Sequence, residues 1–285
     1  MTSLKDLETQ ATNTWCPGCG NFAILLSFKQ AIVQLGIQPE KVVAVSGIGC
    51  HGKITDYLKV NGLHVVHGRV LPAASAVKLA NHELTVVGFA GDGDCYNIGM
   101  GHFPHAVRRN HDITLIVHDN LIYGLTTGQA SPTTKQGQRT RTTPRGVYEP
   151  SVNPIAMALS SEASFVARGF SGEPQHLTEL MKQAINHRGF ALVDVLQPCI
   201  TWDRTQTYAF YRERVYKLEE TDHDAADLDA AHEKSAEWGD RIPIGVFYKK
   251  ERPPFREKYP FLKGEPLARR SIEGLNLEEQ LKELM

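Results

Sequence analysis

The stretch from Gly91 to Gly128, GDGDCYNIGMGHFPHAVRRNHDITLIVHDNLIYGLTTG, decides the fold. It directly follows the apolar run 84–90 (LTVVGFA) and contains a second apolar run at 113–117. Short continuous apolar runs of this kind are typical of parallel strands that are buried on both faces. The carboxyl ends of such strands form the edge at which open α/β sheets bind ligands. We therefore expect a ligand site where these two strands end.

The residues at these strand ends suit a phosphorylated ligand and a metal ion. Gly91 and Gly93 allow the backbone to turn sharply and to approach a ligand closely. A helix predicted over 95–109 would point its amino terminus at the same place, which favours a phosphate. Asp92 offers a carboxylate and Asn120 an amide oxygen, which with a loop carbonyl, water and diphosphate oxygens would make a magnesium shell.

These residues resemble the thiamine diphosphate motif, which consists of GDG and an Asn further along the chain, separated by a linking segment. Here 26 residues (94–119) separate Gly93 from Asn120. A bare GDG most often marks an ordinary turn. The combination of GDG and Asn120, each directly after its own apolar strand, favours a thiamine diphosphate site.

Composition excludes several other classes of protein. The 285 residues are 41% hydrophobic and 22% charged, which is ordinary for a soluble globular chain. A net charge of −1 gives no electrostatic footprint for nucleic acid or an anionic membrane. No apolar stretch reaches the roughly 18 residues of a membrane span, and the polar start MTSLKDLETQ is no secretory signal. We expect a cytoplasmic protein.

Strand, glycine-rich loop and helix alternate through the first half of the chain. Two further strands are predicted at 42–45 and 63–66, and helices at 21–35 and 72–81. This alternation indicates βαβ units, so the predicted fold class is α/β with a doubly wound, mostly parallel sheet.

The second half continues the pattern and then loses it. Helices are predicted at 154–161 and 175–188, and strands at 165–168 and 191–196. The segment 126–152, called loop 126–152 below, has almost no apolar periodicity but carries one lysine and three arginines. Long segments of this kind are functional lids or disordered, and we favour a lid or interface loop.

After residue 200 the pattern weakens. Residues 217–240 are acidic and helical in pattern, and a final helix is predicted at 275–285. The expected division is a cofactor-binding domain at 1–200 and a C-terminal extension at 201–285, packed on the same or a partner subunit.

Four of the five cysteines can converge on one centre. Cys16 and Cys19 have metal-ligand spacing in a Pro/Gly turn, and Cys50 and Cys199 each follow a predicted strand. Four thiolates suit a zinc ion or a [4Fe–4S] cluster, and a lone C-x-x-C could also be a redox dithiol. A cluster beside a carbanion-forming cofactor has a use as electron acceptor, which favours iron–sulfur. Cys95 is expected to be a packed thiol.

Taken together, the motifs identify a resemblance that covers about two thirds of the chain. The sequence resembles the β subunit of 2-oxoacid:ferredoxin oxidoreductases of the pyruvate and 2-oxoglutarate group, including their thiamine diphosphate-binding fold. The resemblance is carried, in chain order, by TWCPGCG (14–20), SGIGCHGK (46–53), HGR (67–69) with LP (71–72), KLAN (78–81), GDGD (91–94), RRN-DI (108–113), DN-IYGLT-GQ-SPT (119–133) and QPC (197–199).

The resemblance implies a role for each matching residue. Cys16, Cys19, Cys50 and Cys199 would hold one [4Fe–4S] cluster, and Asp92, Asn120 and the Ile122 carbonyl would ligate Mg²⁺. The thiamine diphosphate pocket would be lined by Gly49, Cys50, His67, Gly91, Asp92, Gly93, Asp94, Asn120, Ile122, Gly124 and Leu125. Residues acting at the reacting end would be Lys53, His67, Arg69 and Leu125. One departure is His51, where many relatives carry serine.

The function implied is coenzyme A-dependent oxidative decarboxylation of a 2-oxoacid, 2-oxoglutarate or pyruvate, to acyl-CoA and CO₂, with electrons passing through the cluster to ferredoxin. The glutamate that activates the cofactor would come from a partner α subunit, or a fused α/γ subunit, and loop 126–152 is a candidate contact. Two alternatives remain. The first is a non-redox thiamine diphosphate decarboxylase or synthase subunit, which would not need the four cysteines. The second is a zinc-binding scaffold subunit, which would not need Asp92 and Asn120 as magnesium ligands.

Overall fold

An eight-stranded sheet organises the chain in a computed structural model that describes residues 2–273 and 276–283. The strand order is β2-β1-β3-β4-β8-β7-β10-β9. All neighbouring strands are parallel except β10 and β7, so the expected mostly parallel α/β sheet is confirmed. The strands are β1 (Val42–Ser46), β2 (Asn61–His64), β3 (Thr85–Gly91), β4 (Thr114–Asp119), β7 (Phe165–Phe170), β8 (Ala191–Leu196), β9 (Val215–Lys217) and β10 (Ile242–Lys249).

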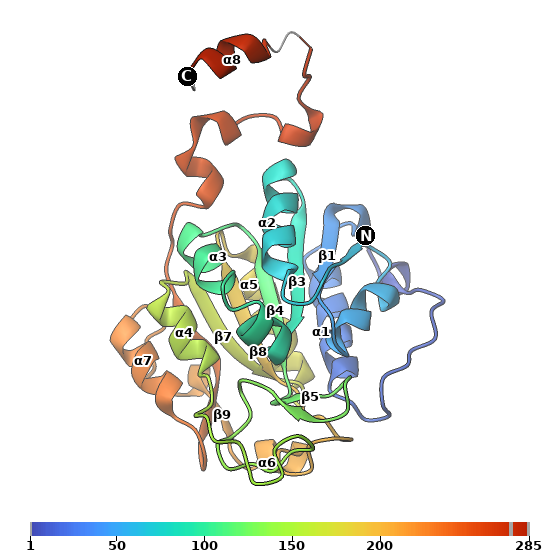
Figure 1. Ribbon diagram of the computed structural model, residues 1–285, viewed down its shortest axis with the longest axis vertical. Coiled ribbons are helices and arrows are strands. Elements are labelled where there is room, and N and C mark those ends of the chain that lie inside the picture. The colour runs from blue at the N-terminus through green and yellow to red at the C-terminus, as the bar shows by residue number, and fades with distance from the viewer. Residues whose placement is uncertain (1, 274–275, 284–285) are drawn as a thin grey trace.

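Helices cover both faces of this sheet (Figure 1). One face packs against α1 (Asn21–Gln34) and α5 (Pro174–Asn186), and the other against α2 (Val70–Ala80), α3 (Phe103–Arg109), α4 (Pro154–Ser160) and α7 (Leu228–Ala236). Successive side chains of a strand point to opposite faces. Val43 and Val45 of β1 therefore enter one core and Val42 and Ala44 the other, which explains why the strands read as unbroken apolar runs.

The continuous helix predicted over 95–109 is wrong. A single π-helical turn (η4, Asp94–Ile98) is followed by a turn, and α3 begins only at Phe103. Gly99 donates its N–H to the Asp94 carbonyl at 2.9 Å, and a Cβ on Gly99 would lie 2.7 Å from that oxygen. Gly99 thus lets the chain close a wide turn, and Pro104 sits in the first turn of α3, where it needs no N–H partner.

Other boundaries differ less. The strand expected at 63–66 lies at Asn61–His64 and is an exposed sheet edge. Only α7 and a 3₁₀ turn at Leu218–Glu220 (η5) are helical within 217–240. The last helix, α8, spans Leu277–Glu283, and Leu275, Leu284 and Met285 of the expected helix lie outside the described residues.

The segment after residue 200 contributes to the same sheet. After α6 (Tyr208–Arg212), β9 pairs in parallel with β10, and β10 pairs antiparallel with β7. The chain then continues as an arm of 3₁₀ turns, η6 (Phe255–Lys258), η7 (Pro260–Leu262) and η8 (Leu267–Arg269). Asn110 fixes the start of this arm, since its side chain donates to the Arg252 carbonyl at 3.1 Å. Figure 1 shows the arm at the amino ends of the strands.

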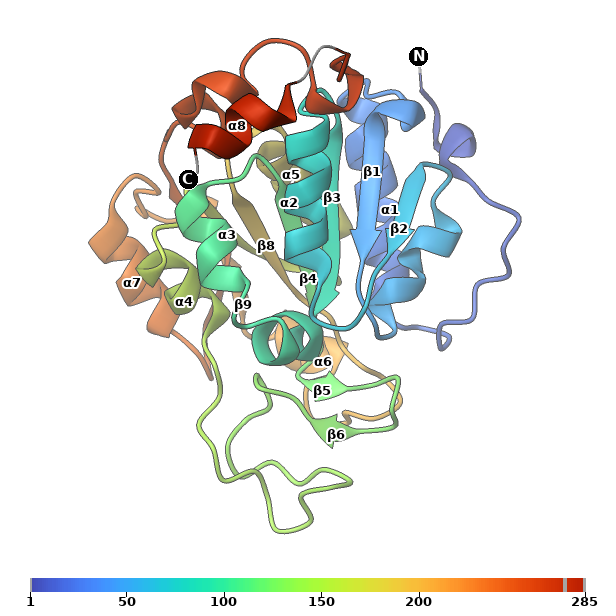
Figure 2. The same cartoon turned by 45° about the horizontal axis from the view of Figure 1, so that its top comes forward.

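Loop 126–152 lies at the carboxyl ends of the strands, on the side opposite the arm, as Figure 2 shows. It starts from a small hairpin of β5 (Ile122–Tyr123) and β6 (Gln129–Ala130). The part that follows, 131–134, is mostly buried, whereas the four basic side chains further along are exposed. Among the described residues, no helix combines the length and apolar character needed to cross a bilayer.

Candidate active site

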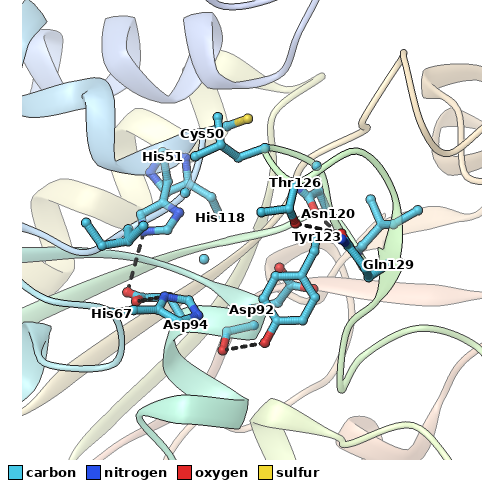
Figure 3. A pocket seen from close by; sticks show the side chains of 17 residues that line it. Cys50, His51, His67, Asp92, Asp94, His118, Asn120, Tyr123, Thr126 and Gln129 are labelled. Atoms are coloured by element: carbon cyan, nitrogen blue, oxygen red, sulfur yellow. Dashed lines mark hydrogen bonds and ion pairs between the residues drawn. The ribbon is translucent and has the colours of Figure 1, made fainter. Parts of the chain in front are cut away.

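A cavity of about 400 Å³ opens at the carboxyl ends of β1, β3 and β4. It lies where the strand order reverses between β1 and β3, the position at which doubly wound sheets bind ligands. Figure 3 shows side chains from several loops converging on it. Every residue expected at the cofactor pocket lines it, namely Gly49, Cys50, His67, Gly91, Asp92, Gly93, Asp94, Asn120, Ile122, Gly124 and Leu125.

A side chain at Gly91 or Gly93 would have to displace the aromatic or imidazole ring beside it. A Cβ on Gly93 would lie 2.2 Å from the Tyr123 ring, and one on Gly91 would lie 2.8 Å from the His51 ring. Tyr123 in turn donates its hydroxyl proton to the Gly93 carbonyl at 3.2 Å. The β5 hairpin is therefore packed directly on the glycine turn.

Asp92 and Asn120 face the same cavity from the ends of β3 and β4. Asp92 is only 3% exposed, and burial raises the pKa of its carboxyl although hydrogen bonds from Ser131 and Thr133 oppose the shift. A buried carboxylate of this kind is stabilised by a bound cation. The Asn120 oxygen accepts the Ile122 N–H at 3.1 Å, which fixes the orientation of the amide. A carboxylate and an amide oxygen at the ends of neighbouring strands, with Ile122 lining the same cavity, are donors of the kind that Mg²⁺ takes.

Asp94 joins two histidines on another wall of the cavity (Figure 3), and it also accepts a backbone N–H. Its Oδ1 lies 2.7 Å from His67 Nδ1 and accepts the Gly68 N–H at 2.7 Å, and its Oδ2 lies 3.5 Å from His51 Nε2. Burial raises the pKa of Asp94, but the contacts with His51, Gly68 and His67 outweigh it and lower the pKa overall. Asp94 is thus an anion that fixes the loop carrying His67.

His118, at the end of β4, also reaches this cavity. Its Nδ1 lies 2.8 Å from the Asn21 side-chain oxygen, which places the ring proton on Nδ1. Nε2 is buried and has no hydrogen-bond partner among the described residues. Burial, reinforced by His51, lowers the pKa of His118 well below its usual value, so the ring is neutral.

A second cavity of about 180 Å³ adjoins the first. Cys16, Cys19, Cys50 and Cys199 all line it, so the structure brings together the four expected cysteines from separate segments of the chain. A Cβ on Gly124 would lie 3.4 Å from the Cys199 sulfur and 3.9 Å from the Cys50 sulfur. The glycine leaves space next to both sulfurs, which is a cradle that fits a thiolate-bound group.

Burial raises the pKa of three of these thiols, so a bound group would have to supply positive charge to hold them as thiolates. Burial, with smaller contributions from the other three thiols, raises the pKa of Cys19 to about 12. Burial also raises the pKa of Cys199, although backbone N–H groups of residues 201–203 partly offset it. A metal centre deprotonates such thiols and removes the mutual repulsion of the thiolates. No ready-made group of three or more His, Cys, Asp or Glu ligands is found within 2–273 and 276–283.

Two residues expected at the reacting end lie outside the first cavity. Lys53 lines the second cavity, where its Nζ donates to Thr14 Oγ1 at 2.9 Å. Arg69 is exposed and donates weakly to the Gly68 carbonyl at 3.4 Å. Cys95 is 4% exposed and packs in the core, away from the other cysteines.

Sequence reasoning missed several lining residues. Ile48, His118, Tyr123, Thr126 and Gln129 were not expected in the first cavity. His118 and Tyr123 lie within two or three residues of Asn120, and proximity to that motif residue is the signal that could have found them.

The fold and the site define a thiamine diphosphate-binding enzyme domain. In agreement, the family described as "Thiamine pyrophosphate enzyme, C-terminal TPP binding domain" matches residues 36–195. A second family, which describes the C-terminal part of the pyruvate ferredoxin oxidoreductase beta subunit, matches residues 199–264.

Relatives narrow the assignment. A Sulfolobus 2-oxoacid:ferredoxin oxidoreductase subunit beta is 49% identical over 262 residues, which cover 88% of this chain and 86% of that protein. A 2-oxoglutarate synthase subunit KorB of Archaeoglobus fulgidus is 44% identical over 70% of this chain and 74% of its own. The chain belongs to the β subunits of the 2-oxoacid:ferredoxin oxidoreductases.

A solved structure agrees with this assignment over the whole chain. It is described as a 2-oxoglutarate:ferredoxin oxidoreductase from Magnetococcus marinus with 2-oxoglutarate, coenzyme A and succinyl-CoA bound. The match has a TM-score of 0.90 and 36% sequence identity, and it covers 100% of this chain and 96% of that one.

Proposed function

We propose that this chain is the thiamine diphosphate-binding β subunit of a cytoplasmic enzyme that oxidises a 2-oxoacid, 2-oxoglutarate or pyruvate, to acyl-CoA and CO₂. Coenzyme A is the acyl acceptor, and electrons leave through a [4Fe–4S] cluster to ferredoxin. The named substrates of the relatives and the bound molecules of the Magnetococcus protein support this choice.

The observation that carries the proposal is that the two cavities share a wall. Cys50, Asn120, Gly124 and Leu125 line both. Gln197 adds a hydrogen-bonded link, because it accepts from the Asn120 amide at 3.2 Å and donates to the Cys19 sulfur at 3.4 Å. A metal-anchored cofactor and a thiolate-bound cluster would therefore be neighbours, as electron transfer between them requires.

In this proposal the strand ends bind the diphosphate and its metal. Asp92, Asn120 and the Ile122 carbonyl hold Mg²⁺, while Gly91 and Gly93 allow backbone N–H groups to approach the phosphates. Asp94, fixed by its contacts with His51 and His67, keeps the loop at 67–68 against the turn. The chain thus supplies a preorganised polar wall, which needs no rearrangement when charge develops.

The remaining roles belong to the reacting end. Bound thiamine diphosphate would supply the nucleophilic carbon and the electron sink for decarboxylation, and the cluster would accept electrons one at a time. His67 and Leu125 line the first cavity and would contact the cofactor or substrate there. Lys53, whose ammonium lies beside the cysteine cavity, and exposed Arg69 would bind carboxylate or phosphate groups once the site is closed by its partner.

The partner is an α subunit, or a fused α/γ subunit. It donates the glutamate that activates the cofactor, together with most coenzyme A contacts. Within this chain we propose residues 1–200 as the cofactor- and cluster-binding domain and 201–285 as an extension that packs on the same or on a partner subunit. The reducing cytoplasm keeps the four cysteines available as ligands.

The test is anaerobic purification of the co-expressed complex, with analysis of metal and cofactor. The proposal expects about four iron atoms per chain with matching sulfide, bound Mg²⁺ and thiamine diphosphate, and ferredoxin reduction that requires both a 2-oxoacid and coenzyme A. Thiamine diphosphate without iron would instead indicate a non-redox decarboxylase or synthase. Zinc without thiamine diphosphate would indicate a scaffold.

A further inference from the structure

Loop 126–152 reaches the base of the magnesium site with Thr133, next to Ser131, which also hydrogen-bonds Asp92. Thr133 is 3% exposed, and its hydroxyl lies 2.8 Å from Asp92 Oδ2 and 2.8 Å from Asp119 Oδ1. Asp92 follows β3, and Asp119 ends β4 directly before Asn120. One loop hydroxyl therefore touches the ends of both strands that carry the proposed magnesium-binding side chains. Its single proton is donated to one of the two carboxylates at a time, and the bond to Asp92 is the one that bears on the metal site.

The segment around Thr133 is held at both sides. Thr134 donates its hydroxyl to the Leu121 carbonyl at 2.6 Å and accepts the Ser131 N–H at 2.7 Å. Ser151 donates to the Thr134 carbonyl at 2.8 Å, and the Val152 N–H donates to the Pro132 carbonyl at 2.8 Å. These contacts fix the backbone at 131–134 independently of any ligand.

We propose that Thr133 is a positioning residue for the magnesium site, which holds the Asp92 carboxylate in its ligating orientation. This inference rests on the proposed function of the first cavity. It assigns a task to a loop residue that is not among the proposed metal ligands.

The physical argument concerns the freedom of one carboxylate. A carboxylate with one oxygen fixed by a hydrogen bond presents the other in a restricted set of directions. Without that bond, Asp92 keeps only the side-chain contact with Ser131, so its carboxylate has more rotational freedom to lose when Mg²⁺ binds and one of its buried hydrogen bonds is missing. Hydrogen bonds to charged groups are stronger than neutral ones, so the loss falls directly on metal affinity.

The experiment compares Thr133→Val, Thr133→Ser and Thr134→Val in the co-expressed complex, stripped of its metal and thiamine diphosphate. Valine keeps the shape of threonine without its hydroxyl, and serine keeps the hydroxyl. Thr134→Val is the matched control, because Thr134 is equally buried but has no contact with Asp92. Isothermal titration calorimetry measures the Mg²⁺ dependence of thiamine diphosphate binding, and thermal unfolding of the stripped complexes measures stability.

The inference expects Thr133→Val to weaken Mg²⁺-dependent binding roughly tenfold or more, with Thr133→Ser close to wild type. Thr134→Val should lower the melting temperature without this loss of affinity. Equal losses in both valine variants, or no loss in Thr133→Val, would show that Thr133 is merely structural. If the unmodified complex bound no thiamine diphosphate at all, the proposed function would fail as well, so the two failures are distinguishable.

Discussion

Gly93 shows at the scale of one residue why the cofactor turn tolerates no side chain. The nearest atoms to a Cβ at this position belong to the Tyr123 ring, at 2.2 and 2.3 Å. We expect Gly93→Ala to destabilise the protein by about 1–3 kcal/mol through overpacking. Gly101→Ala is the control, because a Cβ there meets nothing within 4 Å. Thermal unfolding of the two variants should differ by several degrees, and equal melting temperatures would contradict the packing argument.

The cysteines offer a second comparison between single residues. Cys199→Ser removes one of four sulfurs that line the same cavity, whereas Cys95→Ser alters a buried thiol elsewhere. We expect the first variant to lose most of its iron and visible absorbance after anaerobic purification. The second should keep both. Retention of a full complement of iron in Cys199→Ser would remove this residue from the ligand set.

Two buried histidines, His111 and His187, make the stability of the elements around them depend on pH. His111 stacks on Phe255 of the C-terminal arm at 4.6 Å between ring centroids. Burial lowers its pKa to about 4 from an ordinary 6.5, and Arg109 adds to the shift. Burial likewise lowers the pKa of His187 to about 4, with Lys249 contributing.

In the unfolded chain His111 and His187 therefore bind protons below pH 6.5, whereas in the folded chain these two side chains do so only near pH 4. Their contribution to the free energy of unfolding is fully present above pH 6.5. It falls as the pH drops toward 4, by up to about 1.4 kcal/mol per pH unit for each histidine. His111→Phe keeps an aromatic ring on Phe255 and should make this decline shallower. Chemical denaturation between pH 7 and 4.5 measures it, and an unchanged slope would exclude His111 as a contributor.

The same scale shows what sequence could and could not predict. The apolar runs located the central strands, and the GDG turn with Asn120 located the cavity, because these depend on local pattern and on the common edge of parallel strands. Loop 126–152 has almost no apolar periodicity, so its pattern could not predict that the Thr133 hydroxyl is buried against Asp92. Arg69 and Lys53 were assigned by motif alone, and motifs do not specify which cavity a long side chain enters.

For the whole molecule, exposed apolar side chains border both cavities. Ile48 and Leu125 at the first cavity, and Ile200 and Trp202 at the second, are each 40–45% exposed. Since a partner subunit would cover these residues, we expect the isolated chain to show no 2-oxoacid-dependent ferredoxin reduction and to regain it on mixing with the α subunit. Full turnover by the isolated chain would refute the proposed division of labour.

The wall shared by the two cavities also constrains how this protein can change over evolution or in the laboratory. Cys50, Asn120, Gly124 and Leu125 each face both compartments, so a substitution that reshapes one compartment alters the other in the same step. Mutations here should be epistatic with those on either side, and the cost of one will depend on the presence of others. Substrate range and redox behaviour would then be inherited as a linked pair of traits.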